Sequence, residues 1–94
     1  MVVGICTVYL NLPAAQSLKE KRGVVKSLIA RVRNEFNVSI AEVDANDYCQ
    51  SAILGIVCVS NGKKRVESVL TAVVRMIERS RLDIIVTDFE MELV

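Results

Sequence analysis

The chain has 94 residues, which fits one domain over residues 1–94. Its 12 basic and 11 acidic residues give a net charge of +1, so bulk charge predicts no binding to nucleic acid or membranes, and only a local patch could provide it. Three cysteines without CxxC spacing and the absence of histidine argue against a zinc or iron–sulfur site, so we expect no metal and no cofactor.

The first half of the chain predicts a strand, a helix and a second strand. Residues 2–12 are rich in β-branched side chains, which indicates a strand that Pro13 ends. Ser17 and Glu20 then form a capping box, and apolar residues recur at three- and four-residue steps over 18–36, which predicts a helix. Residues 37–45 predict the second strand.

The second half repeats this pattern after a turn at 46–50. Residues 51–60 predict a strand, 63–79 a helix and 82–93 the last strand. The order β-α-β-β-α-β, with right-handed crossovers, predicts a ferredoxin-like α+β sandwich. Its four-stranded antiparallel sheet should have the order 4-1-3-2, with both helices on one face.

Both sides of the two predicted central strands are apolar, which is typical of strands that are covered on both faces. We therefore expect the open sheet face to pack against another chain, most simply a second copy in a dimer. Selection for β-propensity alone is the alternative explanation. Tyr9 is the only aromatic residue on these strands, so this face lacks the stacking platform of RNA-recognition domains. The expected interface residues are Val3, Ile5, Tyr9, Ile53, Val57 and Val59.

The first predicted helix carries a basic ridge beside its apolar stripe. At 100° per residue, Lys19, Arg22, Lys26 and Arg33 fall within about 60° of one another. Each helix start should lie toward the C-terminal end of a central strand, where the helix dipole and the cations could hold phosphate oxygens. The alternative is solvated surface charge, offset by nearby glutamates. The second helix repeats the basic start with Lys63, Lys64 and Arg65.

Two residues of the first helix fit its pattern poorly. Lys21 falls inside the apolar arc, and we expect its ammonium group to reach water at the helix end. Gly23 costs about 1 kcal/mol in a helix relative to alanine, and close approach by another backbone would explain it.

The acidic residues gather on the two predicted edge strands. Asp88, Glu90 and Glu92 alternate on the last strand, where charge discourages unwanted strand pairing. A weaker alternative is that they meet the basic ridge of a neighbouring copy.

No motif for catalysis is present, so we expect no enzyme activity and no catalytic residues. The glycine-rich loop of acylphosphatases and the CxxC loop of metallochaperones, which share this topology, are both missing. The odd cysteine number favours a reducing compartment, and no signal peptide or membrane-spanning run is visible, which predicts a cytoplasmic protein.

Three segments together resemble the YlxP-like family of small bacterial proteins, a family of unknown function: "SLKEKR" (17–22), "RNEFNVSIAEVD" (33–44) and "LGIVCVSN" (54–61). The resemblance implies the same ferredoxin-like fold and no established activity. Genes of the family often neighbour those of translation initiation and ribosome maturation factors, which implies an association with RNA or ribosomes. Family members commonly have an aromatic residue where this chain has Tyr48 and Cys49, so Cys49 is a departure.

Two functional hypotheses follow. The leading one is a non-enzymatic protein that contacts structured RNA or a ribosomal particle by neutralising phosphates with the basic ridge. The second is a homo-oligomeric interaction module that uses the apolar sheet face and has no nucleic-acid role.

Overall fold

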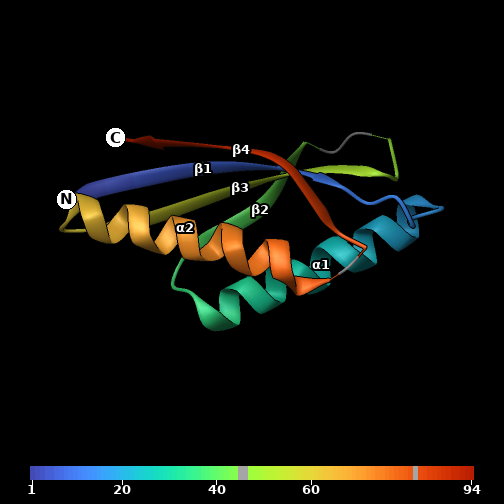
Figure 1. Cartoon of the computed structure of the whole chain (residues 1–94), viewed down its shortest axis with the longest axis horizontal. Coiled ribbons are helices and arrows are strands. Elements are labelled where there is room, and N and C mark those ends of the chain that lie inside the picture. Colours follow the sequence, from blue (N-terminus) through green and yellow to red (C-terminus); the bar gives the residue numbers. More distant parts are fainter. Residues whose placement is uncertain (45–46, 82) are drawn as a thin grey trace.

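Four strands and two helices follow one another in the predicted order (Figure 1). The structure is a computed structural model that describes residues 1–44, 47–81 and 83–94. Its elements are β1 (Val2–Asn11), α1 (Leu18–Glu35), β2 (Ser39–Asp44), β3 (Ser51–Ser60), α2 (Lys63–Ser80) and β4 (Ile85–Leu93).

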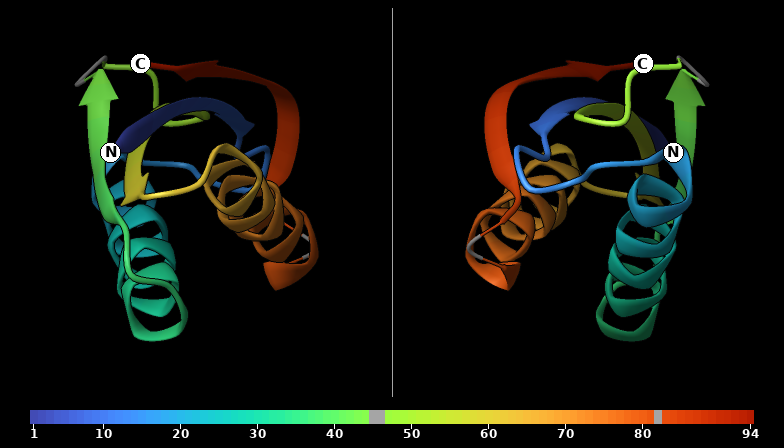
Figure 2. Two further views of the ribbon diagram at one scale, coloured as in Figure 1. Left: turned by 90° about the vertical axis from the view of Figure 1, so that its left-hand side faces the viewer. Right: turned by 90° about the vertical axis from the view of Figure 1, so that its right-hand side faces the viewer.

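The strands form one antiparallel sheet in the order β2-β3-β1-β4, which confirms the predicted order 4-1-3-2. In the central pair, Val2 lies opposite Ser60 and Asn11 opposite Ser51, so β1 and β3 overlap along their whole length. Both helices cover the same face of the sheet and leave the other face open (Figure 2). The ferredoxin-like sandwich is therefore confirmed.

The two central strands alternate between a buried side and a less buried side, as the sequence pattern predicts. Cys6 and Val8 of β1 and Leu54 and Ile56 of β3 are fully buried beneath the helices. Their neighbours along each strand point to the open face because successive side chains of a strand alternate.

Gly4 allows α2 to pack closely against β1. A Cβ atom at this position would overlap Val66 and Leu70, both of which are fully buried on α2. The glycine is needed here because no side chain fits between this strand and the helix.

The predicted boundaries differ most at the last strand, which begins at Ile85 and not at residue 82. A fork of two hydrogen bonds closes the preceding connection: the Arg81 guanidinium donates to both carboxylate oxygens of Asp83, each at 2.8 Å. Residue 82 itself and residues 45–46, which include part of the predicted turn, lie outside the described residues.

Within the part of the chain that the structure describes, no helix is both long enough and apolar enough to cross a membrane.

Candidate functional site

The charges of this protein are separated by secondary structure. The two helices carry eleven of the twelve basic residues but only four of the eleven acidic ones, so their formal charge is +7 and that of the rest of the chain is −6. Because both helices lie on one face of the sheet, the separation by element is also a separation in space. The net charge of +1 therefore conceals a basic helix layer and an acidic sheet layer.

The predicted basic ridge is present on α1 and is open to solvent. Lys19, Arg22, Lys26 and Arg33 are all exposed and extend over about 21 Å of helix. The last three line a groove of about 480 Å³ between α1 and the edge strand β2, whose floor includes Ile29 and other apolar side chains. The ridge thus borders a shallow apolar depression on the β2 side of the helix layer.

Arg33 is partly engaged within the protein. Its Nη2 donates a hydrogen bond of 3.0 Å to the carbonyl oxygen of Ile40 on β2. This contact covers a backbone acceptor on the edge strand and holds the guanidinium beside the groove. Arg22 and Lys26 are therefore the better candidates for an external anion.

The second basic group, Lys63 to Arg65, is exposed but lies at the other end of the molecule. The antiparallel pairing of β1 and β3 places the ends of these two strands, and so the two helix starts, at opposite ends of the sheet. The two groups therefore do not form one phosphate site. The start of α2 lies instead near the end of α1, where Arg65 and Phe36 line a common hollow.

The two helix starts also differ in how their backbone N–H groups are capped. At α1, the Glu20 N–H donates to Ser17 Oγ at 3.1 Å, and the Gln16 N–H donates to Glu20 Oε2 at 2.7 Å. The predicted cap is thus present, although the glutamate binds Gln16 and not Ser17. At α2, Gly62 supplies no side-chain cap and the first turn has no acidic residue. The α1 start thus has one N–H group capped and a carboxylate beside it, which weakens it as a phosphate site.

A further set of basic residues lies between the helices, and two of its members, Arg75 and Arg79, were not predicted as site residues. Lys64, Arg75 and Arg79 of α2 line a hollow of about 560 Å³ together with the end of α1. Their spacing in the sequence follows the helical repeat, with Ser68, Thr71 and Ala72 between them. That periodicity of cations and small residues was the signal that could have identified them.

Lys21 is a buried residue and does not reach solvent, so the expectation that it snorkels is wrong. It is 2% exposed, and its Nζ donates to the carbonyl oxygens of Tyr48 and Ser51 at 3.0 and 3.1 Å. Its Nζ also lies 3.6 Å from Glu42 Oε2 on β2. Lys21 therefore joins the helix layer to β2 and to the β2–β3 connection.

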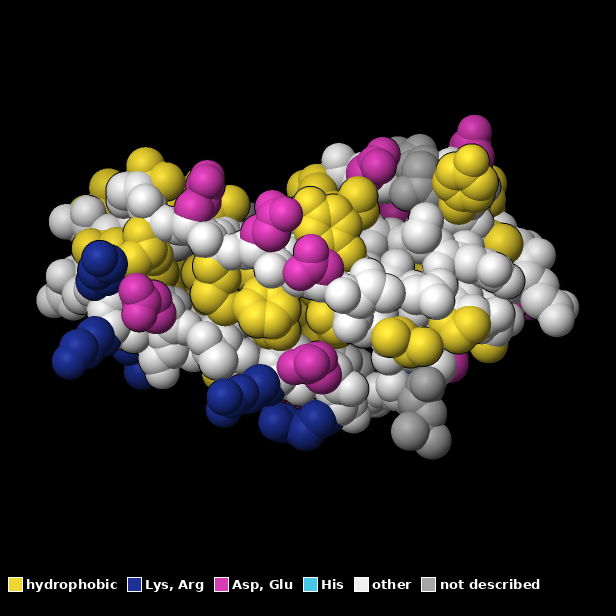
Figure 3. Space-filling view, turned by 45° about the horizontal axis from the view of Figure 1, so that its top comes forward, with side chains coloured by type: hydrophobic (Ala, Val, Ile, Leu, Met, Phe, Trp, Pro, Cys, Tyr) yellow, Lys and Arg dark blue, Asp and Glu magenta, His cyan; other side chains and the backbone are white. Residues whose placement is uncertain are grey.

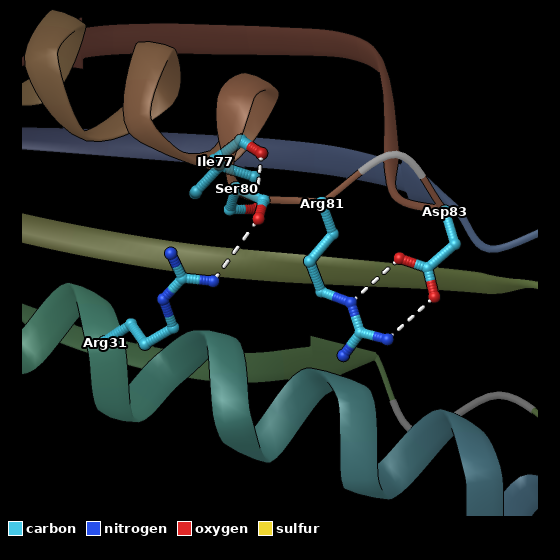
Figure 4. A network of polar contacts seen from close by, with 5 residues as sticks. All are labelled: Arg31, Ile77, Ser80, Arg81 and Asp83. Carbon is cyan, nitrogen blue, oxygen red and sulfur yellow. Dashed lines mark hydrogen bonds and ion pairs between the residues drawn. The ribbon is translucent and has the colours of Figure 1, made fainter.

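A second polar network joins α1 to the end of α2 (Figure 4). Arg31 Nη1 donates to the Ser80 carbonyl oxygen at 3.4 Å, and Ser80 Oγ donates to the Ile77 carbonyl oxygen at 2.8 Å. A cation at this position is favourable because a helix C-terminus carries partial negative charge. Beside it, the hydrogen bond from Arg81 lowers the pKa of Asp83. Both arginines therefore have partners within the chain.

No close backbone explains Gly23. The space around its missing Cβ is empty to 4 Å, and the residue borders a hollow of about 360 Å³ beside Arg81 and Asp83. Within the described chain, therefore, the expected close approach does not occur.

The open sheet face carries all six predicted interface residues. Val3, Ile5 and Tyr9 lie opposite Val59, Val57 and Ile53 respectively, and opposite residues of paired strands share a face. Val57 and Val59 are 41% and 58% exposed. The structure thus places these six side chains together on the open face.

An acidic row borders that apolar surface along β4. Asp88, Glu90 and Glu92 are exposed and lie opposite Tyr9, Thr7 and Ile5 of β1. They therefore share the open face with the apolar residues. Figure 3, which views the molecule obliquely from the sheet side, shows acidic side chains among apolar ones and the basic side chains along the rim toward the helices.

The cysteines provide no evident reactive site. Cys6 and Cys58 are buried in the core, and burial raises the pKa of Cys6 to about 11. Cys49 is partly exposed, and its thiol donates to the Ala15 carbonyl oxygen at 3.5 Å. Among the described residues, no group of three Cys, Asp or Glu side chains is arranged to hold a metal ion.

Comparisons with solved structures agree with this fold. The designed protein Foldit4 matches with a TM-score of 0.54 and 14% identity, over 100% of this chain and 97% of that one. A C-terminal segment of the alpha subunit of aIF2 from Pyrococcus abyssi matches with a TM-score of 0.53 and 14% identity, over 99% of this chain and 49% of that one. The designed ferredoxin-fold protein LFR1 1 has a TM-score of 0.50 and 17% identity over 100% and 83%. At these identities, the likeness concerns the fold alone.

Sequence comparisons identify the family. The uncharacterised protein YlxP of Bacillus subtilis (strain 168) is 44% identical over 64 residues, which are 68% of this chain and 70% of the relative. The model of a protein family of unknown function, DUF503, matches residues 3–91. The predicted resemblance is confirmed: the chain belongs to the DUF503 family, which includes YlxP-like proteins.

Proposed function

We propose that this protein binds structured RNA, free or within a ribosomal particle, through the basic surface of its helix layer. The observation that carries the proposal is the separation of charge, with +7 on the helices and −6 on the rest of the chain. A polyanion is attracted to a basic surface and repelled by an acidic one, so the separation also gives the bound RNA an orientation.

The positions of the cations favour phosphate contacts over base recognition. Arg22 and Lys26 stand along one side of α1, and Lys64, Arg75 and Arg79 line the hollow between the helices. Exposed cations spread over two neighbouring helices can neutralise several phosphates, whereas the aromatic side chain that the described residues place beside them, Phe36, is partly buried. We therefore expect affinity that depends on RNA shape and salt more than on sequence.

The proposed role is binding without catalysis, in the cytoplasm. The chain has no histidine, and exposed glutamates of the helix layer, Glu35 and Glu67, share the hollow between the helices with its cations. A general acid or base must lie within hydrogen-bond reach of the reacting group. No catalytic motif accompanies these carboxylates in the sequence, which supports a role in binding.

The direct test uses deproteinised ribosomal RNA, so that protein contacts do not contribute. Binding of the native protein is measured by anisotropy at about 50 and 200 mM salt, beside the variant Arg22→Glu, Lys26→Glu. We expect native binding to weaken steeply with salt, and the variant to bind at least about tenfold more weakly with a smaller salt slope. Equal binding by both proteins, or binding that salt does not affect, would contradict the proposal.

The open sheet face supports the second hypothesis, association through an apolar surface. The specific observation is that Val57 and Val59 remain exposed beside further apolar side chains of β1. A homodimer through this face stays a prediction. Analytical ultracentrifugation of the native chain and of Val57→Lys tests it: a native dimer that the substitution converts to a monomer would support it, and a native monomer would exclude it.

A further inference from the structure

The open sheet face is organised in rows that run across all four strands. One row contains Ser39, Val57, Ile5 and Glu92, and the next contains Ala41, Gly55, Thr7 and Glu90. In both rows, the β2 end is small and uncharged and the β4 end is a carboxylate, whereas the centre is apolar in the first row and small in the second. The face is thus an apolar surface with one acidic border.

The apolar surface extends onto β2. Val43 is 61% exposed, and its side chain occupies the place that a Cβ atom of Gly55 would fill. Gly55 therefore lets Val43 lean over the sheet, toward Val57 on the same strand as the glycine. A contiguous exposed apolar surface of this kind marks an interaction site more often than a plain solvated face.

The charges of the open sheet face indicate which kind of partner can bind to it. None of the four strands contains a lysine or arginine, whereas β4 presents Asp88, Glu90 and Glu92 along one border. Two copies packed face to face would bring two such acidic rows to one interface without a cation from either sheet. Like charges that lose water at an interface are unfavourable, and so is the approach of an RNA backbone.

We propose that the open sheet face docks a basic amphipathic segment of another protein. The apolar side of that segment would cover Ile5, Tyr9 and Val57, and its Lys or Arg side chains would lie over the acidic row of β4. Such a partner meets the apolar and the charged part of the face together, which a second copy packed face to face does not. The proposal is independent of RNA binding, because it concerns the face opposite the helices.

The test uses a defined peptide, since the surface specifies the chemistry of the partner and not its sequence. A helical peptide of about five turns carries leucines along one side and lysines along the flank. Its matched control replaces the lysines by glutamates, and a second control has the same residues in scrambled order. Binding is followed by the amide and methyl NMR signals of the full chain, which locate the contact.

We expect the lysine peptide to shift the signals of Ile5, Val57 and Val59, and the two control peptides to leave them unchanged. The protein variant Glu90→Lys, Glu92→Lys should lose at least about tenfold in affinity for the lysine peptide and gain affinity for the glutamate peptide. Two outcomes would overturn the proposal: a native chain that self-associates through this face with the same shifts, or a lysine peptide that binds elsewhere or not at all. Neither outcome bears on RNA binding by the helix layer.

Discussion

The helix layer and the open sheet face of this protein carry charges of opposite sign. The helices carry eleven basic residues, and their outer surface has cations beside hollows lined by small and apolar side chains. The strands carry no basic residue, and their open face combines exposed valines with a row of carboxylates. One small domain thus offers two surfaces that suit different partners.

This difference shows that the net charge of a two-layer fold does not indicate the charge of its individual surfaces. At +1, the chain looks neutral as a whole, and only the sum over each element reveals the separation. Long-range attraction depends on where charges lie as well as on their total, especially at distances of about one Debye length, roughly 8 Å at physiological salt. A polyanion near the helices is expected to experience a strongly basic surface.

The largest effect on stability is expected where the charges of the two layers meet, at Lys21. The change Lys21→Met removes the hydrogen bonds to the carbonyl groups of Tyr48 and Ser51 and leaves Glu42 without its cation, so we expect a loss of about 2–4 kcal/mol in the free energy of unfolding. Lys26→Met, five residues along the same helix at an exposed position, should change it by less than about 0.5 kcal/mol. Denaturant unfolding of both variants measures the contrast, and similar values for the two would refute the buried role of Lys21.

Two glycines allow a comparison between backbone that is covered by packed side chains, at Gly4, and backbone that is open, at Gly23. Gly4→Ala should destabilise the fold by about 1–3 kcal/mol, because the added Cβ overlaps Val66 and Leu70 in a packed core. Gly23→Ala should stabilise it by about 0.5–1 kcal/mol, because the site is empty and alanine favours helix. Thermal unfolding of the two variants should therefore shift the midpoint in opposite directions. A destabilised Gly23→Ala variant would show that the helix surface at this point is not free.

The smallest expected effect concerns the reactivity of the cysteine thiols and does not involve the stability of the fold. At pH 8, the Cys6 thiol stays protonated because its pKa is raised to about 11, and it is also buried. We expect one thiol, Cys49, to react with iodoacetamide in the folded chain, and all three to react after denaturation. Peptide mass mapping assigns the sites, and rapid labelling of Cys6 in the native state would contradict the core packing.

The fold could be predicted from the sequence because its signals are local. Apolar periodicity separates the helices from the strands, and the apolar character of both sides of β1 and β3 indicates their central position. The charge separation was equally available, since eleven of the twelve cations fall within the two predicted helices. The distance between the basic groups at Lys19 and Lys63 also follows once the central strands are antiparallel.

The role of Lys21 could not be predicted in the same way. Its partners, the carbonyl groups of Tyr48 and Ser51 and the carboxylate of Glu42, come from residues 21 to 30 positions away in the sequence. The ammonium group of a lysine inside an apolar arc must either reach water or donate to buried acceptors. Which of the two occurs here depends on the three-dimensional path of the β2–β3 connection. The engagement of Arg33 by a β2 carbonyl depends on tertiary packing for the same reason.

The most direct test of the charge separation keeps the net charge constant and exchanges charges between the layers. The variant Arg22→Glu, Lys26→Glu, Glu90→Lys, Glu92→Lys has the native formal charge, and its folding is checked by circular dichroism. Its affinity for deproteinised ribosomal RNA is measured beside that of the native chain at about 50 mM salt. A loss of at least about tenfold is the result that the helix-layer account predicts. Native affinity in the exchanged variant would show that the arrangement of charge on the helices does not direct RNA binding, and would contradict the account.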